Sequence, residues 1–342
     1  MITKRTIKTE IPVSHDNEVT SAVGTAGKPP SNLRPDSLAD FIGQSELIDN
    51  LRISIKASIN RNTQLDHILL YGPPGLGKTS LASIVAKELH RNIKITTGAA
   101  IERQGDLVSI LNSLSDGDVL FIDEIHRLST CVEEVLYPAM EDYKIDVMVG
   151  KEQQAKSIRL DLPAFTLIGA TTRLGMISMP LRDRFGIISR LHLYTTDELT
   201  SIVSGYAKKL GVKIGKSEAT LIAATSRGTP RIAIRLMKRC RDYADVTNRG
   251  VINTDTINHA LSAMNINCEG LNADDILILK CIERHNGKPV GLSTLSASLG
   301  EDEQTIEDVY EPYLIQNGYL SRTPKGRVLT DRAERFLSTL SA

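Results

Sequence analysis

The chain has 342 residues, with 41 lysines and arginines against 41 aspartates and glutamates, so its formal net charge is zero. This balance excludes a uniformly basic protein that coats nucleic acid, because contacts with phosphates must then come from local groups of Lys and Arg. Hydrophobic residues (41%) and charged residues (24%) are typical of globular proteins, and the length predicts two or three domains.

Neither the cysteines nor the apolar runs suggest a secreted or membrane protein. The cysteines lie far apart, without a C-x-x-C pair or a histidine at zinc-ligand spacing, so we expect free thiols in a reducing compartment. No apolar run approaches the roughly 18 residues of a membrane span, and the N-terminus lacks the apolar region of a signal peptide. We therefore expect a cytoplasmic protein with no membrane partner.

Apolar runs alternate with helical patterns in the first half of the chain. The first 31 residues mix Thr, Ser, Gly and Pro without periodicity, and we expect a flexible tail there. Three apolar runs follow, at 68–71, 119–122 and 165–170, and a helical spacing covers 79–89. This alternation predicts an α/β fold with a parallel sheet and functional residues at the carboxyl ends of its strands.

A hairpin is expected between the second and third runs, over residues 143–162. Apolar residues alternate with other residues on both arms, and a polar tip at 151–156 separates the arms. The segment is too long to be a mere connection.

The second half of the chain is helical. Four helical segments are expected at 197–210, 217–226, 230–246 and 254–264. Three more follow, at 271–285, 292–299 and 303–316, and then two short strands around the turn in YLSRTPKGRVLT. Three helices followed by a β-ribbon predict a winged-helix domain.

The sequence GPPGLGKT at 72–79 satisfies the P-loop pattern and lies between an expected strand and an expected helix. Gly75 and Gly77 allow the backbone N–H groups to face phosphates, and the start of the helix adds positive dipole. Lys78 is expected to reach the β- and γ-phosphates, and Thr79 to offer its hydroxyl to Mg²⁺. ATP or ADP with Mg²⁺ is the predicted ligand set.

Asp123 and Glu124 end the second apolar run. An acidic pair at a strand end can be a helix cap, but beside a P-loop it predicts a Mg²⁺ carboxylate, Asp123, and a general base, Glu124. Thr171 and Thr172 end the third run, and we expect one of them to position water or sense the γ-phosphate.

The remaining residues that we expect to contact the nucleotide phosphates are arginines. In PLRDRFG at 180–186, Arg182 or Arg184 is predicted to reach the γ-phosphate of a neighbouring subunit, although surface ion pairing alone would also fit. Residues 227–250 hold seven Lys or Arg against two Asp. Within them Arg231, at a helix start, is the residue predicted to contact the nucleotide.

Several strings occur in order: LRP at 33–35, GPPGLGKT, LFIDEIHRL, VEEVLYPAMEDY, FTLIGATTR, PLRDRFG, RGTPRIA and EPYLIQNGYLSRTPKGR. They closely resemble the bacterial RuvB family of AAA+ motors, which drive branch migration of Holliday junctions together with RuvA. The resemblance spans about residues 32–335.

The resemblance implies an AAA+ ATPase domain with a parallel sheet, a small helical lid and a C-terminal winged helix. The expected boundaries are a tail at 1–31, the ATPase domain at 32–194, the lid at 195–267 and the winged helix at 268–342. It also implies a homohexamer on duplex or junction DNA, docking on RuvA through the hairpin, and the resolvase RuvC as a further partner.

The resemblance also implies roles for single residues. Lys78, Thr79 and Ser80 would bind phosphates and Mg²⁺, Asp123 and Glu124 would form Walker B, and Thr172 would be sensor one. Arg184 would be the finger acting on the next subunit, and Arg231 sensor two. The nucleotide-binding set would further include Leu33, Arg34, Glu141, Asp142, Tyr143 and Tyr194.

Arg322 and Arg327 match wing positions that contact the DNA backbone in the family. Residues 271–342 hold eight Lys or Arg against eleven Asp or Glu, whereas 320–335 hold five against two, so DNA contact is expected only on the wing side.

One departure from the family concerns Met179, which stands where members commonly carry a small hydroxylic residue and could alter the subunit contact near Arg184. A rival reading from another class is a nucleotide-gated DNA-binding switch, such as an initiator or clamp-loader-like protein. A protein unfoldase is a third alternative.

Overall fold

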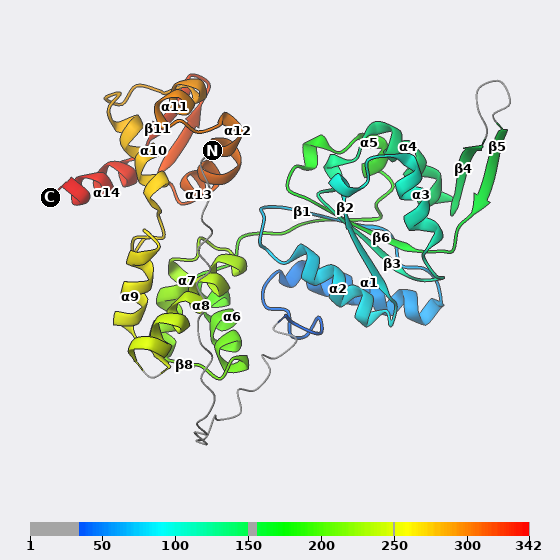
Figure 1. Cartoon of the computed structure of the whole chain (residues 1–342), viewed down its shortest axis with the longest axis horizontal. Helices are drawn as coiled ribbons and strands as arrows, with labels where there is room; N and C mark the ends of the chain where they lie inside the picture. The colour runs from blue at the N-terminus through cyan, green and yellow to red at the C-terminus, as the bar shows by residue number, and fades with distance from the viewer. Residues whose placement is uncertain (1–33, 150–155, 249, 342) are drawn as a thin grey trace, which may run out of the picture. The chain divides into compact units, whose positions relative to one another are not determined.

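The computed structural model describes residues 34–149, 156–248 and 250–341 (Figure 1). The predicted tail at 1–31, Leu33 and most of the predicted hairpin tip lie outside the described residues.

The ATPase domain is built on a parallel sheet of five strands in the order β2-β3-β6-β1-β7. The strands are β1 Ile68–Tyr71, β2 Ile93–Thr97, β3 Val119–Asp123, β6 Thr166–Thr171 and β7 Ile187–Arg190. The three predicted apolar runs are the three central strands, whose continuous apolar character follows from burial on both faces. The predicted parallel sheet is confirmed.

Helices cover both faces of this sheet (Figure 1). Ile68 and Leu70 pack with helices α1 (Ser45–Arg61) and α2 (Lys78–Glu88), whereas Leu69 packs with α3 (Gln104–Asn112) and α4 (Thr130–Glu141). Successive strand residues point to opposite faces, so one short run serves both cores. The short helix α5 (Met179–Arg182) precedes β7.

The predicted hairpin at 143–162 is confirmed. It consists of β4 (Lys144–Val149) and β5 (Lys156–Asp161), which pair antiparallel with Val147 opposite Ile158. Ile145 is buried at the base, while Ile158 is 46% exposed farther along the hairpin. The hairpin thus carries at least one large apolar side chain in solvent.

Four helices follow, as predicted: α6 (Thr196–Lys209), α7 (Lys216–Ala224), α8 (Pro230–Thr247) and α9 (Thr254–Ala263). Two short strands, β8 (Lys213–Ile214) and β9 (Val251–Ile252), pair between them. A proline opens α8, and the helix buries one face at helical spacing through Ala233, Leu236, Met237, Cys240 and Ala244. Within the described ranges, no helix is both long and apolar enough to cross a bilayer.

The C-terminal part has the predicted order of helices and β-ribbon. Helices α10 (Ala273–Glu283), α11 (Leu292–Leu299), α12 (Glu303–Thr305) and α13 (Glu311–Gln316), with a π-helical turn before α13, precede the ribbon β10 (Leu320–Thr323) and β11 (Gly326–Leu329). The chain then forms a further helix, α14 (Asp331–Ser341), which the sequence reading did not include. Its Ala333, Phe336 and Leu337 complete the core of this domain.

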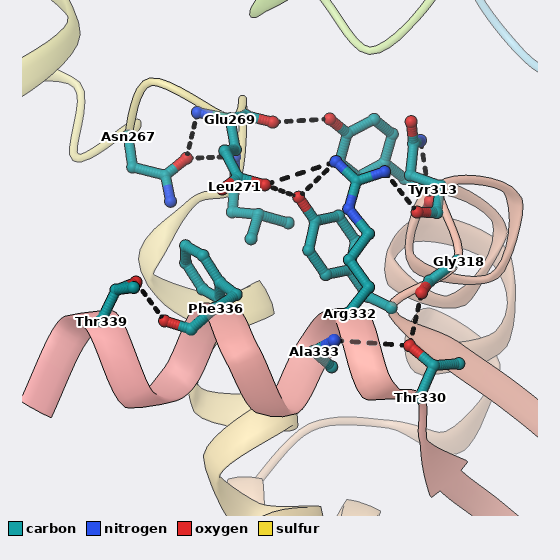
Figure 2. A network of polar contacts seen from close by, with 12 residues as sticks. Asn267, Glu269, Leu271, Tyr313, Gly318, Thr330, Arg332, Ala333, Phe336 and Thr339 are labelled. Atoms are coloured by element: carbon teal, nitrogen blue, oxygen red, sulfur yellow. Dashed lines mark hydrogen bonds and ion pairs between the residues drawn. The ribbon is translucent and has the colours of Figure 1, made fainter.

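A polar network fixes the entry to this domain (Figure 2). The hydroxyl of Tyr313 donates to the carbonyl of Glu269 at 2.8 Å, and the hydroxyl of Tyr319 donates to the Glu269 carboxylate. Arg332 of α14 donates to Tyr319 Oη at 3.1 Å and to the carbonyl of Asn317 at 3.0 Å. The network therefore joins the segment before α10 to α13 and α14.

Candidate nucleotide site

The P-loop links the carboxyl end of β1 to the start of α2. Gly75 and Gly77 have φ of 82° and 101°, in the left-handed region that glycine adopts without a Cβ penalty. A Cβ on Gly75 would lie 2.8 Å from Thr229 Cγ2 and 3.0 Å from Arg231 Cβ. The glycine therefore permits both the curl of the loop and its close approach to the start of α8.

Lys78 begins α2 with its ammonium buried under this loop. The side chain donates to the carbonyls of Gly72 (2.7 Å) and Pro73 (3.0 Å), and the residue is only 7% exposed. No carboxylate among the described residues forms an ion pair with it. Since an ammonium has three donors, one is left for an anion in front of the loop.

Electrostatics at Lys78 also point to a bound anion. Burial lowers the pKa of its ammonium, the charges of Asp123 and Glu124 raise it, and the nearby Arg231 lowers it. Two cations that converge on one glycine-rich loop at a helix start form a site suited to phosphate groups.

The acidic pair lies at the carboxyl end of β3, the strand beside β6. Asp123 Oδ1 accepts the N–H of Glu124 at 3.0 Å, and Glu124 has a φ of 50°. A left-handed non-glycine residue is a strained conformation that other contacts must maintain. Gly98 allows this turn, because a Cβ there would lie 2.4 Å from the carbonyl oxygen of Glu124.

A histidine that the sequence analysis did not predict lies between the ends of β3 and β6: His126 follows β3 and contacts Thr171, the last residue of β6. His126 Nε2 lies 3.3 Å from Glu124 Oε2, and His126 Nδ1 lies 2.9 Å from Thr171 Oγ1. Thr171 is fully buried, whereas Thr172 is half-buried and its hydroxyl has no partner within the described ranges. A histidine two residues after a strand-end glutamate was the available signal for this contact.

Two predicted residues bring the lid segment to the loop. The backbone N–H of Arg231 donates to the carbonyl of Gly75 at 3.3 Å. The phenol of Tyr194 donates to the carbonyl of Leu76 at 3.0 Å, and its burial raises the pKa of this phenol. Thr79 and Ser80 are half-buried in the first turn of α2. The structure thus collects most of the predicted residues at one edge of the sheet.

A second group of predicted residues lies at the opposite edge. Arg184 precedes β7 and donates to the carbonyl of Pro180 (2.6 Å) and to Glu141 Oε2 (3.2 Å), with its guanidinium 4.5 Å from the ring centre of Tyr137. Asp142 caps the end of α4, and Tyr143 follows it. A cavity of about 340 Å³ opens between Arg184, Tyr143 and His67, the residue before β1.

The strands separate these two groups. β1 has four residues, so its two ends are separated by three steps of about 3.3 Å, or roughly 10 Å. Arg184, Glu141, Asp142 and Tyr143 are therefore not brought to the P-loop of their own chain.

Arg34 also lies away from the phosphate loop. Its carbonyl accepts from Lys209 Nζ at 3.2 Å, and Asp36, two residues on, pairs with Lys87 in the last turn of α2. Nine residues of helix place Lys87 about 13 Å from Lys78 along the axis.

The two wing arginines differ in their surroundings. Arg322 is 58% exposed in its side chain and pairs with Glu307 at 2.6 Å. Arg327 is 7% exposed in its side chain and pairs with Glu311 at 2.5 Å and Glu307 at 2.9 Å. Direct contact between Arg327 and a DNA phosphate would require a buried ion pair to open, so the geometry favours Arg322.

Comparisons with known proteins match the chain along almost all of its length. The model of the Holliday junction DNA helicase RuvB P-loop domain matches residues 33–191, that of the RuvB AAA lid domain 194–267, and that of the RuvB C-terminal winged helix domain 268–338.

Solved structures give the same result. The Holliday junction branch migration motor RuvB of Thermotoga maritima is 50% identical, with a TM-score of 0.80 over 90% of this chain and 98% of that one. Two point mutants of Thermotoga maritima RuvB, also 50% identical over 90% of this chain and 98% of theirs, align with TM-scores of 0.82 and 0.81.

The close contact at Gly75 gives a first prediction. Gly75→Ala should weaken ATP binding about tenfold, because a left-handed alanine costs roughly 1–2 kcal/mol and its Cβ would push the loop from Thr229 out of the phosphate-binding shape. Isothermal titration with ATP would measure the change. Gly105→Ala, at a glycine with open space, is the matched control, and equal affinities in both variants would contradict the prediction.

Proposed function

Because the chain belongs to the RuvB family of Holliday junction DNA helicases, we propose that each subunit contributes residues to two ATPase sites, its own and that of a neighbouring subunit. As a member of this family it is a P-loop ATPase that acts on DNA and drives branch migration. The buried ammonium of Lys78, which within the described residues is hydrogen-bonded to two loop carbonyls, is the observation that carries the proposed nucleotide site.

The proposed domain limits are a tail at 1–31, the ATPase domain at 32–194, the lid at 195–267 and the winged helix at 268–342. The matches to three RuvB domain models, at 33–191, 194–267 and 268–338, support this division. Tyr194 supports the first internal boundary, since it contacts both the P-loop and the lid turn at Gly228.

Lys78 and the backbone of Gly75 and Gly77 hold the phosphates of ATP, together with Ser80. Mg²⁺ suits the oxygen donors here, because it usually takes one or two protein oxygens besides phosphates and water, and Thr79 and Asp123 offer two. When bound, Mg²⁺ would neutralise charge that develops on the phosphates.

Glu124 is the proposed general base, since its carboxylate stands beside Asp123 at the edge of the sheet that the P-loop occupies. It would accept a proton from the attacking water, and Thr172, whose hydroxyl has no partner among the described residues, would orient that water. Arg231 would contact the phosphates from the lid. Arg34 and Leu33 would line the nucleotide away from the phosphates.

Arg184 would act on the nucleotide of a neighbouring subunit. Its position at the sheet edge opposite its own P-loop supports this role, as do the pairings that hold it at the surface. Glu141, Asp142 and Tyr143 share its edge and would belong to the same shared pocket. A closed homohexamer on DNA would give every site such a neighbour.

The wing would grip DNA through phosphates and without sequence preference. Arg322 is the proposed contact, and Arg327 would hold Glu307 and Glu311 beneath it. The hairpin, with Ile158 exposed, would dock on RuvA through its apolar face, and RuvC would join the same assembly. We propose that the protein and these partners act in the cytoplasm.

Mixed subunits test the shared site. Arg184→Ala and Asp123→Asn should each lose ATP hydrolysis by a factor of about 10³ or more. In a mixture, an Asp123→Asn subunit can lend its Arg184 to a neighbour with intact Walker B residues, so part of the ATPase rate should return. Phosphate release as a function of mixing ratio measures this. If no ATP hydrolysis returns at any mixing ratio, the result would argue against an arginine supplied by the neighbouring subunit.

The wing arginine can be tested by salt titration. Arg322→Ala should weaken duplex binding equally for unrelated sequences and reduce the slope of log K against log salt by about one. Fluorescence anisotropy would measure both. Arg52→Ala removes an exposed, ion-paired arginine from α1 and serves as the control. The same loss in both variants would contradict a wing contact.

A further inference from the structure

The carboxylate of Glu124 has one side-chain partner in the described part of the chain, and that partner is His126. The two side chains meet at 3.3 Å between Oε2 and Nε2. The His126 side chain is 8% exposed, while that of Glu124 is 38% exposed. A buried, held imidazole therefore contacts a carboxylate that faces the solvent side of the site.

Hydrogen-bond donors and acceptors fix the direction of this chain of contacts. The N–H of Arg173 donates to Thr171 Oγ1 at 2.9 Å, which leaves Thr171 its own hydroxyl proton to donate. An ionised Glu124 carboxylate can only accept, so a neutral His126 turns its N–H at Nε2 toward Glu124, and His126 Nδ1 accepts from Thr171 Oγ1 at 2.9 Å. With Nδ1 as acceptor, a neutral imidazole carries its proton on Nε2, which faces Glu124. Each donor in this chain of hydrogen bonds, from Arg173 to Glu124, then has an acceptor.

The charge state of His126 agrees with this order. Burial lowers the pKa of the imidazole, more than the neighbouring Glu124 raises it. A neutral ring can donate at one nitrogen and accept at the other, whereas a protonated ring would turn a donor toward Thr171. The chain of hydrogen bonds from Arg173 to Glu124 therefore requires a neutral His126 ring.

We propose that His126 is a positioning residue that couples Glu124 to the segment after β6. We call the chain of contacts from Arg173 through Thr171 and His126 to Glu124 the relay. Thr171 and Arg173 flank Thr172, so a shift of this segment when Thr172 contacts the γ-phosphate would pass through Thr171 and His126 to the Glu124 carboxylate. The left-handed backbone of Glu124 and its flexible side chain make such a restraint useful. The inference rests on the proposed role of Glu124 as general base.

A hydroxyl swap at Thr171 tests the relay with little change in shape. Thr171→Val keeps the branched volume and removes the hydroxyl, whereas Thr171→Ser keeps the hydroxyl. We expect Thr171→Val to lower kcat for ATP by about 10- to 100-fold, as for a reacting group displaced by about 1 Å, with KM and nucleotide affinity unchanged. Thr171→Ser should return kcat to within about threefold of the parent.

Controls separate positioning from folding. Thr200→Val changes another buried threonine, in α6, and should leave kcat unchanged. Nucleotide affinity reports that each variant keeps its folded site. An unchanged kcat in Thr171→Val, or equal losses in Thr171→Val and Thr171→Ser, would overturn the relay.

Two further measurements complete the test. The ¹⁵N shifts of His126 should show a proton on Nε2 and none on Nδ1, and the opposite tautomer would overturn the proposed direction. Glu124→Gln tells the two hypotheses apart: if hydrolysis persists in it, the general base and the relay both fail. If hydrolysis stops there but Thr171→Val stays fully active, only the relay fails.

Discussion

The nucleotide site depends on one desolvated cation, the ammonium of Lys78. A buried charge without an ion-pair partner is costly, and within the described residues two loop carbonyls accept its hydrogen bonds while the charges of Asp123 and Glu124 stabilise it from farther away. The loop can provide these carbonyls because Gly75 and Gly77 adopt left-handed conformations that other residues reach only at a cost in free energy. An anion would relieve both Lys78 and the nearby Arg231, so the stability of this region and its affinity for nucleotide have the same physical origin.

The parallel sheet then decides what one chain can and cannot do alone. Its carboxyl edge gathers the P-loop, the acidic pair and the lid contacts, while Arg184 and Glu141 stand at the amino edge. A single chain cannot bring these edges together across the strands. The proposed sharing of ATPase sites between subunits would couple hydrolysis to relative movement of the subunits.

Sequence reasoning predicts what depends on local pattern. The P-loop, the central strands and Asp123 and Glu124 follow from motif and apolar spacing. Strands β2 and β7 were missed because edge strands are only partly buried and lack a continuous apolar run. The relay through His126 joins separate elements that only the folded sheet brings together, and the burial of Arg327 depends on carboxylates from the preceding helices. A count of the basic residues on the wing therefore overestimates how many arginines are exposed enough to contact DNA.

The measurement that tests the whole account most directly follows a synthetic four-way junction in the presence of RuvA and ATP. The wild-type chain should move the branch point and separate the junction into two duplexes. Lys78→Ala should leave the junction intact, because it removes the cation on which the site depends. ATP turnover by the wild-type chain with no junction movement, under conditions in which RuvA is bound, would contradict the account and favour a nucleotide-gated switch.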